Sequence, residues 1–227
     1  MIPVLIVPVL NRYDLLDRML DSIDHPVGHV VIVDNGGGLE HDGLHSVIRL
    51  PHNIGVGAAW NLGMKVTPLA PWWLIANNDL EWGQGDLARL TDAVDPEADD
   101  LYFMLGMAAF AVTRYTIGRL GYFDENIHPA YDEDVDYSRR ADLVGVRKVE
   151  VGFTGSHVGS ATIYSDAELR RRNAHTHWAN DLYYAAKWGG QKQGGETFAT
   201  PFNREGHVGE WQLDPERLRT QAWKRDG

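Results

Sequence analysis

Four apolar runs in the N-terminal part of the chain are each followed, within three residues, by asparagine or aspartate. The polar groups stand, in order, at Asn11-Arg12, Asp34-Asn35, Asn53 and Asn77-Asn78-Asp79. Any one of these groups can be a turn signal, because turns favour the same residue types. Four in succession, at one edge of a sheet, indicate a ligand site instead, because open α/β sheets bind ligands outside the carboxyl ends of their strands.

The familiar signatures for binding a nucleotide or hydrolysing a substrate are absent from the sequence. It holds no G-x-G-x-x-G, G-x-x-x-x-G-K-[ST], H-E-x-x-H or G-x-S-x-G motif. It also holds no cysteine, which excludes thiolate metal sites and cysteine nucleophiles. The remaining chemistry is that of carboxylates, which can hold Mg²⁺ or Mn²⁺ and, through the ion, the oxygens of a phosphate group.

Alternating strands and helices are predicted to position these polar groups. Continuous apolar runs predict strands, and apolar residues at helical spacing predict helices. The predicted strands are 2–10, 29–33, 47–50, 72–76, 101–105, 107–113 and 147–151, and the predicted helices are 13–23, 57–66, 133–144 (capped by Asp132) and 168–188. Strand and helix alternate over residues 1–95, so we expect an α/β fold with a mostly parallel sheet flanked by helices.

The balance of charge and hydropathy narrows the classes of partner. The 227 residues carry a net charge of −11, from 21 basic and 32 acidic side chains. An acidic surface opposes sequence-independent binding to nucleic acid, which requires basic patches. No apolar run reaches the roughly 18 residues of a membrane helix, and no secretion signal is recognisable. We therefore expect a cytoplasmic protein without a transmembrane segment, and peripheral membrane attachment stays open.

A series of short motifs, taken in order along the chain, resembles those of family 2 glycosyltransferases. The motifs are Val7-Pro8-Val9-Leu10-Asn11-Arg12, Val33-Asp34-Asn35, Asn53-Ile54-Gly55 through Asn61-Leu62-Gly63, Asn77-Asn78-Asp79, Gly121-Tyr122-Phe123-Asp124-Glu125, Glu133-Asp134-Val135-Asp136 with Arg139, Thr154-Gly155-Ser156-His157 and Lys187-Trp188-Gly189. Each motif is weak alone, and their order makes the resemblance specific. The match covers roughly residues 3–190.

The resemblance implies a GT-A type fold, a Rossmann-like sheet with a smaller acceptor-side half. We expect a single domain over residues 1–190, in which 1–95 bind the nucleotide and 96–165 form the acceptor and catalytic half. Residues 191–227 are then a C-terminal extension. We expect the glycine-rich segment 189–209 to be mobile without ligand and to order over the donor as a lid.

The resemblance also implies an activity. It is that of a metal-dependent inverting transferase, which moves a hexosyl or deoxyhexosyl group from a UDP-, GDP- or dTDP-sugar to a hydroxyl group, with Mn²⁺ or Mg²⁺ as cofactor. It makes Asp79 a metal ligand, Asp134 the catalytic base and Asp34 a ligand of the base or ribose. The donor-binding residues that it implies are Pro8, Asn11, Arg12, Asp34, Asn53, Asn61, Asn77 and Asn78, and the acceptor-side residues are Asp124, Glu133 and Asp136.

Two departures from the family pattern affect these roles. The first D-x-D position is Asn77, so metal affinity depends more heavily on Asp79 and the phosphates. Trp60 precedes Asn61, where many relatives have a basic or small residue, so the identity of the donor does not transfer. The acids from Glu133 onward also have a plainer explanation, because carboxylates favour the first turn of a helix.

The histidines offer further candidate metal ligands. His157 is the second predicted ligand, because it stands between Gly155 and Gly159 after the last predicted strand. His175 and His177 resemble an H-x-H metal pair, but residues two apart on a helix face different directions. We therefore interpret both as helix surface.

Two other functions remain open. A sugar nucleotidylyltransferase has a similar nucleotide-binding sheet, but it is expected to carry a Gly-rich basic loop after the first strand, unlike residues 8–12. A non-catalytic carbohydrate-binding protein on the same fold is disfavoured by the intact Asp79 and Asp134. The acceptor can be a glycan, a lipid-linked glycan or a protein, with nucleic acid disfavoured by the charge, and the oligomeric state is open.

Overall fold

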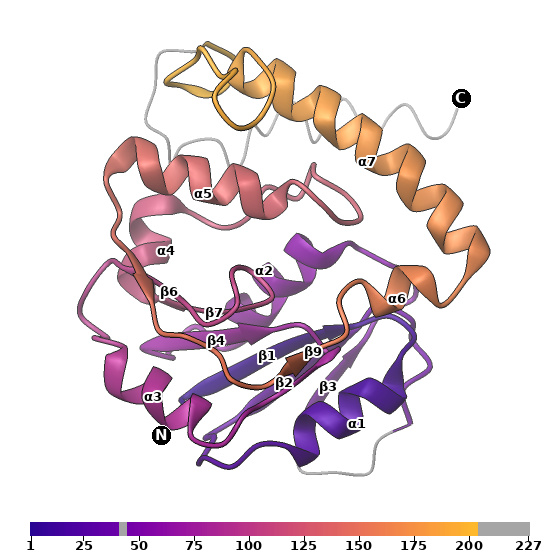
Figure 1. The fold of residues 1–227 in the computed structure, drawn as a ribbon, viewed down its shortest axis with the longest axis vertical. Helices are drawn as coiled ribbons and strands as arrows, with labels where there is room; N and C mark the ends of the chain where they lie inside the picture. The colour runs from indigo at the N-terminus through magenta and orange to yellow at the C-terminus, as the bar shows by residue number, and fades with distance from the viewer. Residues whose placement is uncertain (41–44, 204–227) are drawn as a thin grey trace.

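A seven-stranded sheet forms the centre of the computed structural model, which describes residues 1–40 and 45–203 (Figure 1). Its strand order is β3-β2-β1-β4-β7-β6-β8. The strands are β1 (Val4–Val9), β2 (Val30–Asp34), β3 (Ser46–Arg49), β4 (Trp72–Ala76), β6 (Leu101–Phe103), β7 (Ala109–Thr113) and β8 (Lys148–Glu150). All neighbours are parallel except β7, which is antiparallel to both β4 and β6. The predicted mostly parallel α/β sheet is confirmed.

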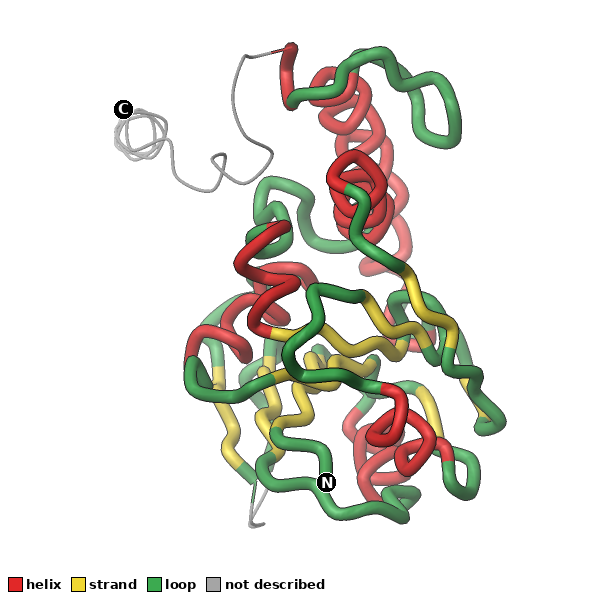
Figure 2. Tube along the Cα trace, turned by 90° about the vertical axis from the view of Figure 1, so that its left-hand side faces the viewer, coloured by secondary structure: helices red, strands yellow, loops and turns green. Residues whose placement is uncertain are grey.

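Helices cover both faces of this sheet, which explains why β1, β2 and β4 are buried along their whole length (Figure 2). One face packs on α1 (Tyr13–Asp21) and α3 (Asp86–Ala93). The other face packs on α2 (Val56–Val66), α4 (Arg114–Leu120) and α5 (Glu133–Val144). The carboxyl ends of β1, β2 and β4 carry the polar groups that the sequence singled out.

A small second sheet lies beside these strand ends. It pairs β5 (Leu80–Glu81) with β9 (Ser156–His157) in antiparallel register, so that Leu80 is opposite His157. The two backbones approach closely at Gly155, where an added Cβ atom would lie 1.9 Å from the carbonyl oxygen of Glu81. Only glycine permits this approach.

The C-terminal part of the described chain is helical. After α6 (Ala161–Tyr164), the long α7 (Ala167–Trp188) crosses the molecule and ends beside α5 (Figure 1). Asp166 caps α7 by accepting a hydrogen bond from the Leu169 N–H at 2.7 Å, and Gly189 ends it in the left-handed conformation. A short 3₁₀ turn, η1 (Pro201–Asn203), follows. Among the described helices, none has the length and apolar character to cross a membrane.

The described part of the predicted lid packs against α5 and α7. The N–H groups of Thr197 and Phe198 donate to the Trp188 carbonyl, and Arg139 of α5 donates to the Phe198 carbonyl at 2.7 Å. In Figure 1 this segment lies at the end of α7 that is far from α6. The ordering of this segment over a bound donor stays a prediction, and residues 204–227 lie outside the described part of the chain.

Candidate functional site

Asp79 and His157, the two predicted metal ligands, lie side by side. Asp79 immediately precedes β5 and His157 ends β9, so the pairing of these two short strands brings them together. His157 Nε2 lies 3.1 Å from Asp79 Oδ1, and the Ala161 N–H donates to Asp79 Oδ2 at 3.2 Å. The Asp79 side chain is buried, whereas about a quarter of the His157 side chain is exposed (26%).

This pair fits a divalent metal ion. Two ligand atoms that each bind one ion at about 2.1 Å lie about 3 Å apart when they occupy adjacent positions. The observed 3.1 Å between imidazole nitrogen and carboxylate oxygen matches that spacing. Imidazole nitrogen is a common ligand of transition metals such as Zn²⁺, and carboxylate oxygen suits Mn²⁺ and Mg²⁺.

The loop that delivers His157 is held by a buried carboxylate of α3. Asp86 accepts hydrogen bonds from the N–H groups of Gly83 and Gly155 and from both the N–H and the hydroxyl of Thr154. Burial alone would raise the pKa of Asp86, but these bonds hold it below its ordinary value. No local sequence pattern indicates this role, because 68 residues separate Asp86 from Thr154.

Four predicted donor-binding residues lie at the same strand ends as Asp79. Asn78 donates to the Arg12 carbonyl at 3.0 Å, which ties the turn after β4 to the loop after β1. Asn11 donates to the carbonyl of Thr162 in α6 at 3.3 Å. The Arg12 guanidinium donates two hydrogen bonds, at 2.8 and 2.6 Å, to the carboxylate of Asp14. Asn77 is half-buried beside them.

Three other predicted donor-binding residues are buried and make contacts inside the chain, and their role at the donor stays a prediction. Pro8 is buried within β1, between β2 and β4. Asp34 is fully buried, and its carboxylate accepts hydrogen bonds from the Tyr13 hydroxyl and three backbone N–H groups of the following loop. Asn61 is fully buried and bonds the N–H and the carbonyl of Phe123, each at 2.9 Å. Asp34 and Asn61 therefore shape loops.

Asn53 has a similar local role. Its side chain accepts a hydrogen bond from the Gly55 N–H at 2.8 Å, and its carbonyl lies 3.2 Å from Nε2 of His128. Gly55 adopts a φ of +90° and leaves no room for a side chain against His128. Asn53 thus closes the turn before α2 and contacts the loop that leads to α5.

Asp134 and Glu133 begin α5 and differ sharply in environment. Asp134 is half-buried, accepts a hydrogen bond from the Val135 N–H at 2.8 Å, and makes no ion pair within the described part of the chain. Burial, together with the neighbouring Asp134 charge, raises the pKa of Glu133 to about 8. At neutral pH Glu133 is therefore a neutral acid, next to the half-buried Asp134.

Asp124 and Asp136, predicted on the acceptor side, belong to a buried ion network, and their acceptor-side role stays a prediction. The Lys187 ammonium, fully buried, lies 2.6 Å from Asp124 Oδ2 and 2.5 Å from Asp136 Oδ1. Asp136 also accepts from Arg140 at 3.0 Å and from the Trp188 indole at 2.9 Å. Burial alone would raise the pKa of Asp124, but the Lys187 charge lowers it to about 2. The network anchors α7 to α5.

Two contacts that were not predicted from the sequence connect the loop before α5 to the loop that carries His157 and to α7. The Tyr131 and Ser160 hydroxyls lie 3.1 Å apart, which joins the residues before α5 to the segment after His157. Asn180 of α7 is buried and donates to the carbonyls of Ala130 and Tyr131 at 3.0 and 3.1 Å. The position of Asp134 is thereby coupled to both α7 and the His157 loop.

Comparison with known proteins supports the fold. No protein-family model matches the chain. A stretch of 42 residues is 50% identical to a galactofuranosyl glycosyltransferase of Leishmania donovani, and it covers 18% of this chain and 10% of that protein. A mannosyltransferase of Pyrobaculum calidifontis, solved with GDP-Man and Mn²⁺, superimposes with a TM-score of 0.55 and 17% identity, over 79% of this chain and 63% of that one.

Staphylococcus aureus TarS gives a TM-score of 0.54 at 17% identity, over 80% of this chain and 68% of that one. The chain spans less than two thirds of the mannosyltransferase and a tenth of the curated relative. The strand order of the central sheet and these superpositions indicate the same fold. The chain has the GT-A fold of glycosyltransferases.

Proposed function

We propose that the chain is a metal-dependent inverting glycosyltransferase that uses a nucleoside-diphosphate sugar as donor and a hydroxyl group as acceptor. The observation that carries this proposal is the 3.1 Å pair of Asp79 and His157, at the strand ends where Arg12 and Asn78 also lie. The fold is shared with a mannosyltransferase that was solved with GDP-Man and Mn²⁺. That likeness supports the same class of donor and cofactor here.

In this proposal Asp79 and His157 hold Mn²⁺ or Mg²⁺. The ion, when bound, neutralises the charge that develops on the departing diphosphate. Asn11, Asn77 and Asn78 supply amide groups for the donor. The Arg12 guanidinium, now paired with a carboxylate, can exchange that partner for a phosphate, because its paired N–H donors fit either anion.

Asp134 is the proposed base. As the acceptor oxygen forms its bond to the anomeric carbon, Asp134 takes the hydroxyl proton. The bond from that carbon to the diphosphate oxygen breaks, and its electron pair leaves with the oxygen. Attack from the face opposite the diphosphate inverts the anomeric centre. The absence of an ion pair at Asp134, within the residues described, leaves its carboxylate available for the proton.

Calorimetry tests the metal bridge first. UDP, GDP and dTDP are titrated into the protein with Mn²⁺ or with EDTA, and we expect the best nucleotide to bind far more weakly in EDTA. Equal affinity in both conditions excludes the bridge. Sugar forms of that nucleotide are then screened for metal-dependent hydrolysis and transfer. Proton NMR of the first product reads its anomeric configuration, and retention of configuration overturns the inverting mechanism.

A further inference from the structure

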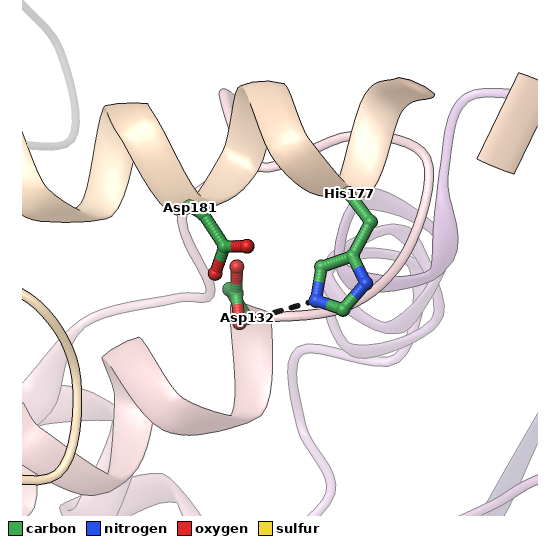
Figure 3. A group of neighbouring side chains, drawn as sticks. All are labelled: Asp132, His177 and Asp181. Carbon is green, nitrogen blue, oxygen red and sulfur yellow. Dashed lines mark ion pairs between the residues drawn. The ribbon is translucent and has the colours of Figure 1, made fainter. Parts of the chain in front are cut away.

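A second group of side chains that could hold a metal ion lies between α5 and α7 (Figure 3). Asp132 immediately precedes α5, and His177 and Asp181 project from α7 one turn apart, on the same helix face. Ligand atoms of the three residues all lie within 4.8 Å of one another. His177 Nε2 lies 4.0 Å from Asp132 Oδ1. His177, which was predicted as helix surface, has a side chain that is 39% exposed and also faces this group.

The carboxylate of Asp132 is buried and incompletely satisfied. Its side chain is 2% exposed. Contrary to the prediction, this side chain forms no capping hydrogen bond with α5. Oδ1 lies 2.5 Å from the Lys192 ammonium, whereas Oδ2 is buried without a hydrogen-bond partner among the residues described. Figure 3 shows one Asp132 oxygen directed at the Asp181 carboxylate. Facing carboxylates repel, and an unpaired buried oxygen is costly, so the single Lys192 ammonium leaves this pair of carboxylates incompletely neutralised.

We propose that Asp132, His177 and Asp181 form a second divalent-metal site, of the zinc class, in which Lys192 acts as a displaceable cation. One imidazole and two carboxylates are a ligand set that Zn²⁺ uses, with a water molecule in the fourth position. The Tyr131 ring lies 4.8 Å from the His177 ring and restricts its orientation. A bound ion would join α5 to α7 directly ahead of Asp134.

Substitution of Lys192 should change the metal affinity in a direction that is specific to this proposal. Its ammonium lies 2.5 Å from Asp132 and 2.9 Å from Asp181, so it occupies the position that a metal ion would need. Removing the ammonium therefore removes a competitor and should tighten metal binding. If the cluster served only to hold Lys192, the same substitution would lower stability and do nothing for metal affinity.

Titration of the full chain with Co²⁺, in the absence of any nucleotide, tests the site. Visible absorption and calorimetry both report binding to a site with an imidazole ligand. We expect His177→Ala to weaken binding at least about tenfold, and Lys192→Met to tighten it severalfold. His175→Ala is the matched control, because His175 is an exposed histidine on the same helix, and it should leave the affinity unchanged.

His157→Ala distinguishes this site from the donor side and should retain the Co²⁺ signal. Loss of the signal in His157→Ala, with retention in His177→Ala, places the ion at the β5–β9 pair and overturns the proposal. Equal affinity in His177→Ala and His175→Ala also overturns it. If His177→Ala fails to fold, an unchanged or weaker affinity of Lys192→Met is decisive against it. None of these outcomes depends on glycosyl transfer, so this experiment tests the second metal site independently of the proposed function.

Discussion

Replacing Lys187 with methionine tests the buried ion network that anchors α7. Methionine keeps most of the side-chain length and removes the charge. The Lys187 ammonium is fully buried and lies 2.6 Å from Asp124 and 2.5 Å from Asp136, so the substitution leaves two buried carboxylates without their shared cation. Removing one partner of a buried ion pair costs about 3–5 kcal/mol of unfolding free energy. We expect a loss in that range at pH 7.

The pKa of Asp124 gives an independent measure of part of this loss. It falls from 3.8 to about 2 in the folded chain. Since one pKa unit corresponds to about 1.4 kcal/mol, the shift represents about 2–3 kcal/mol of stability. A carboxyl group with a lowered folded pKa stabilises the fold above pH 4, and that contribution disappears as the pH falls through 2. The gap between wild type and Lys187→Met should therefore narrow in acid.

Urea denaturation at pH 7 and at pH 3 measures both effects. Lys65→Met is the matched control, because Lys65 also pairs with a carboxylate at 3.0 Å but both side chains are about half exposed (48% and 49%). An exposed pair of this kind contributes about 0–1 kcal/mol. A Lys187→Met protein that loses no more stability than Lys65→Met would refute the network's role. A large loss that does not change with pH would refute the pKa argument.

Three further tests address the site itself. Asp134→Asn should leave donor affinity unchanged and lower the rate of transfer by roughly 10²–10⁴-fold. Asp79→Asn should instead weaken metal-dependent nucleotide binding and transfer together. Calorimetry and kinetics on both variants distinguish these outcomes. Because Glu133 titrates at about 8 in the folded chain, wild-type stability should fall as the pH rises from 4.5 to 8. Glu133→Gln should remove that slope in denaturation curves, and the exposed control Glu150→Gln should retain it. Gly155→Ala should destabilise the chain by roughly 1–3 kcal/mol and weaken metal-dependent nucleotide binding, since the added Cβ atom meets a β5 carbonyl at 1.9 Å; unchanged melting and binding would contradict the close approach.

The longer elements of the fold were predictable because their residues repeat with a clear period. The strand Trp72–Ala76 and the helix Glu133–Val144 have the predicted bounds. The strands β5 and β9 were missed, since two residues cannot show a period. The helices α3 and α4 were missed as well, although Thr113 forms a capping box with Thr116 at the start of α4. Their short lengths left too few apolar repeats to recognise.

The site was predictable as a set of candidates and not as a set of contacts. Asp79 and His157 were each predicted as metal ligands. Their 3.1 Å contact depends on the β5–β9 pairing, which no local sequence pattern predicts. Asp34 and Asn61, both predicted as donor-binding residues, form hydrogen bonds with the chain's own backbone. Asparagine and aspartate at a strand or helix boundary bind either a ligand or the chain's own backbone, and the residue type alone does not say which.

Helix α7 explains why the two halves of the site depend on each other. At its C-terminal end, Lys187 joins it to the α5 network, and in its middle Asn180 holds the loop that leads to Asp134. Tyr131 of that loop contacts Ser160, next to the residue whose N–H binds Asp79. A shift of α7 must therefore move the proposed base relative to the proposed metal ligands. Loosening the Lys187 anchor should consequently lower the rate of transfer more than the affinity for the donor, because the base is held by α7 and the donor is held by the strand ends.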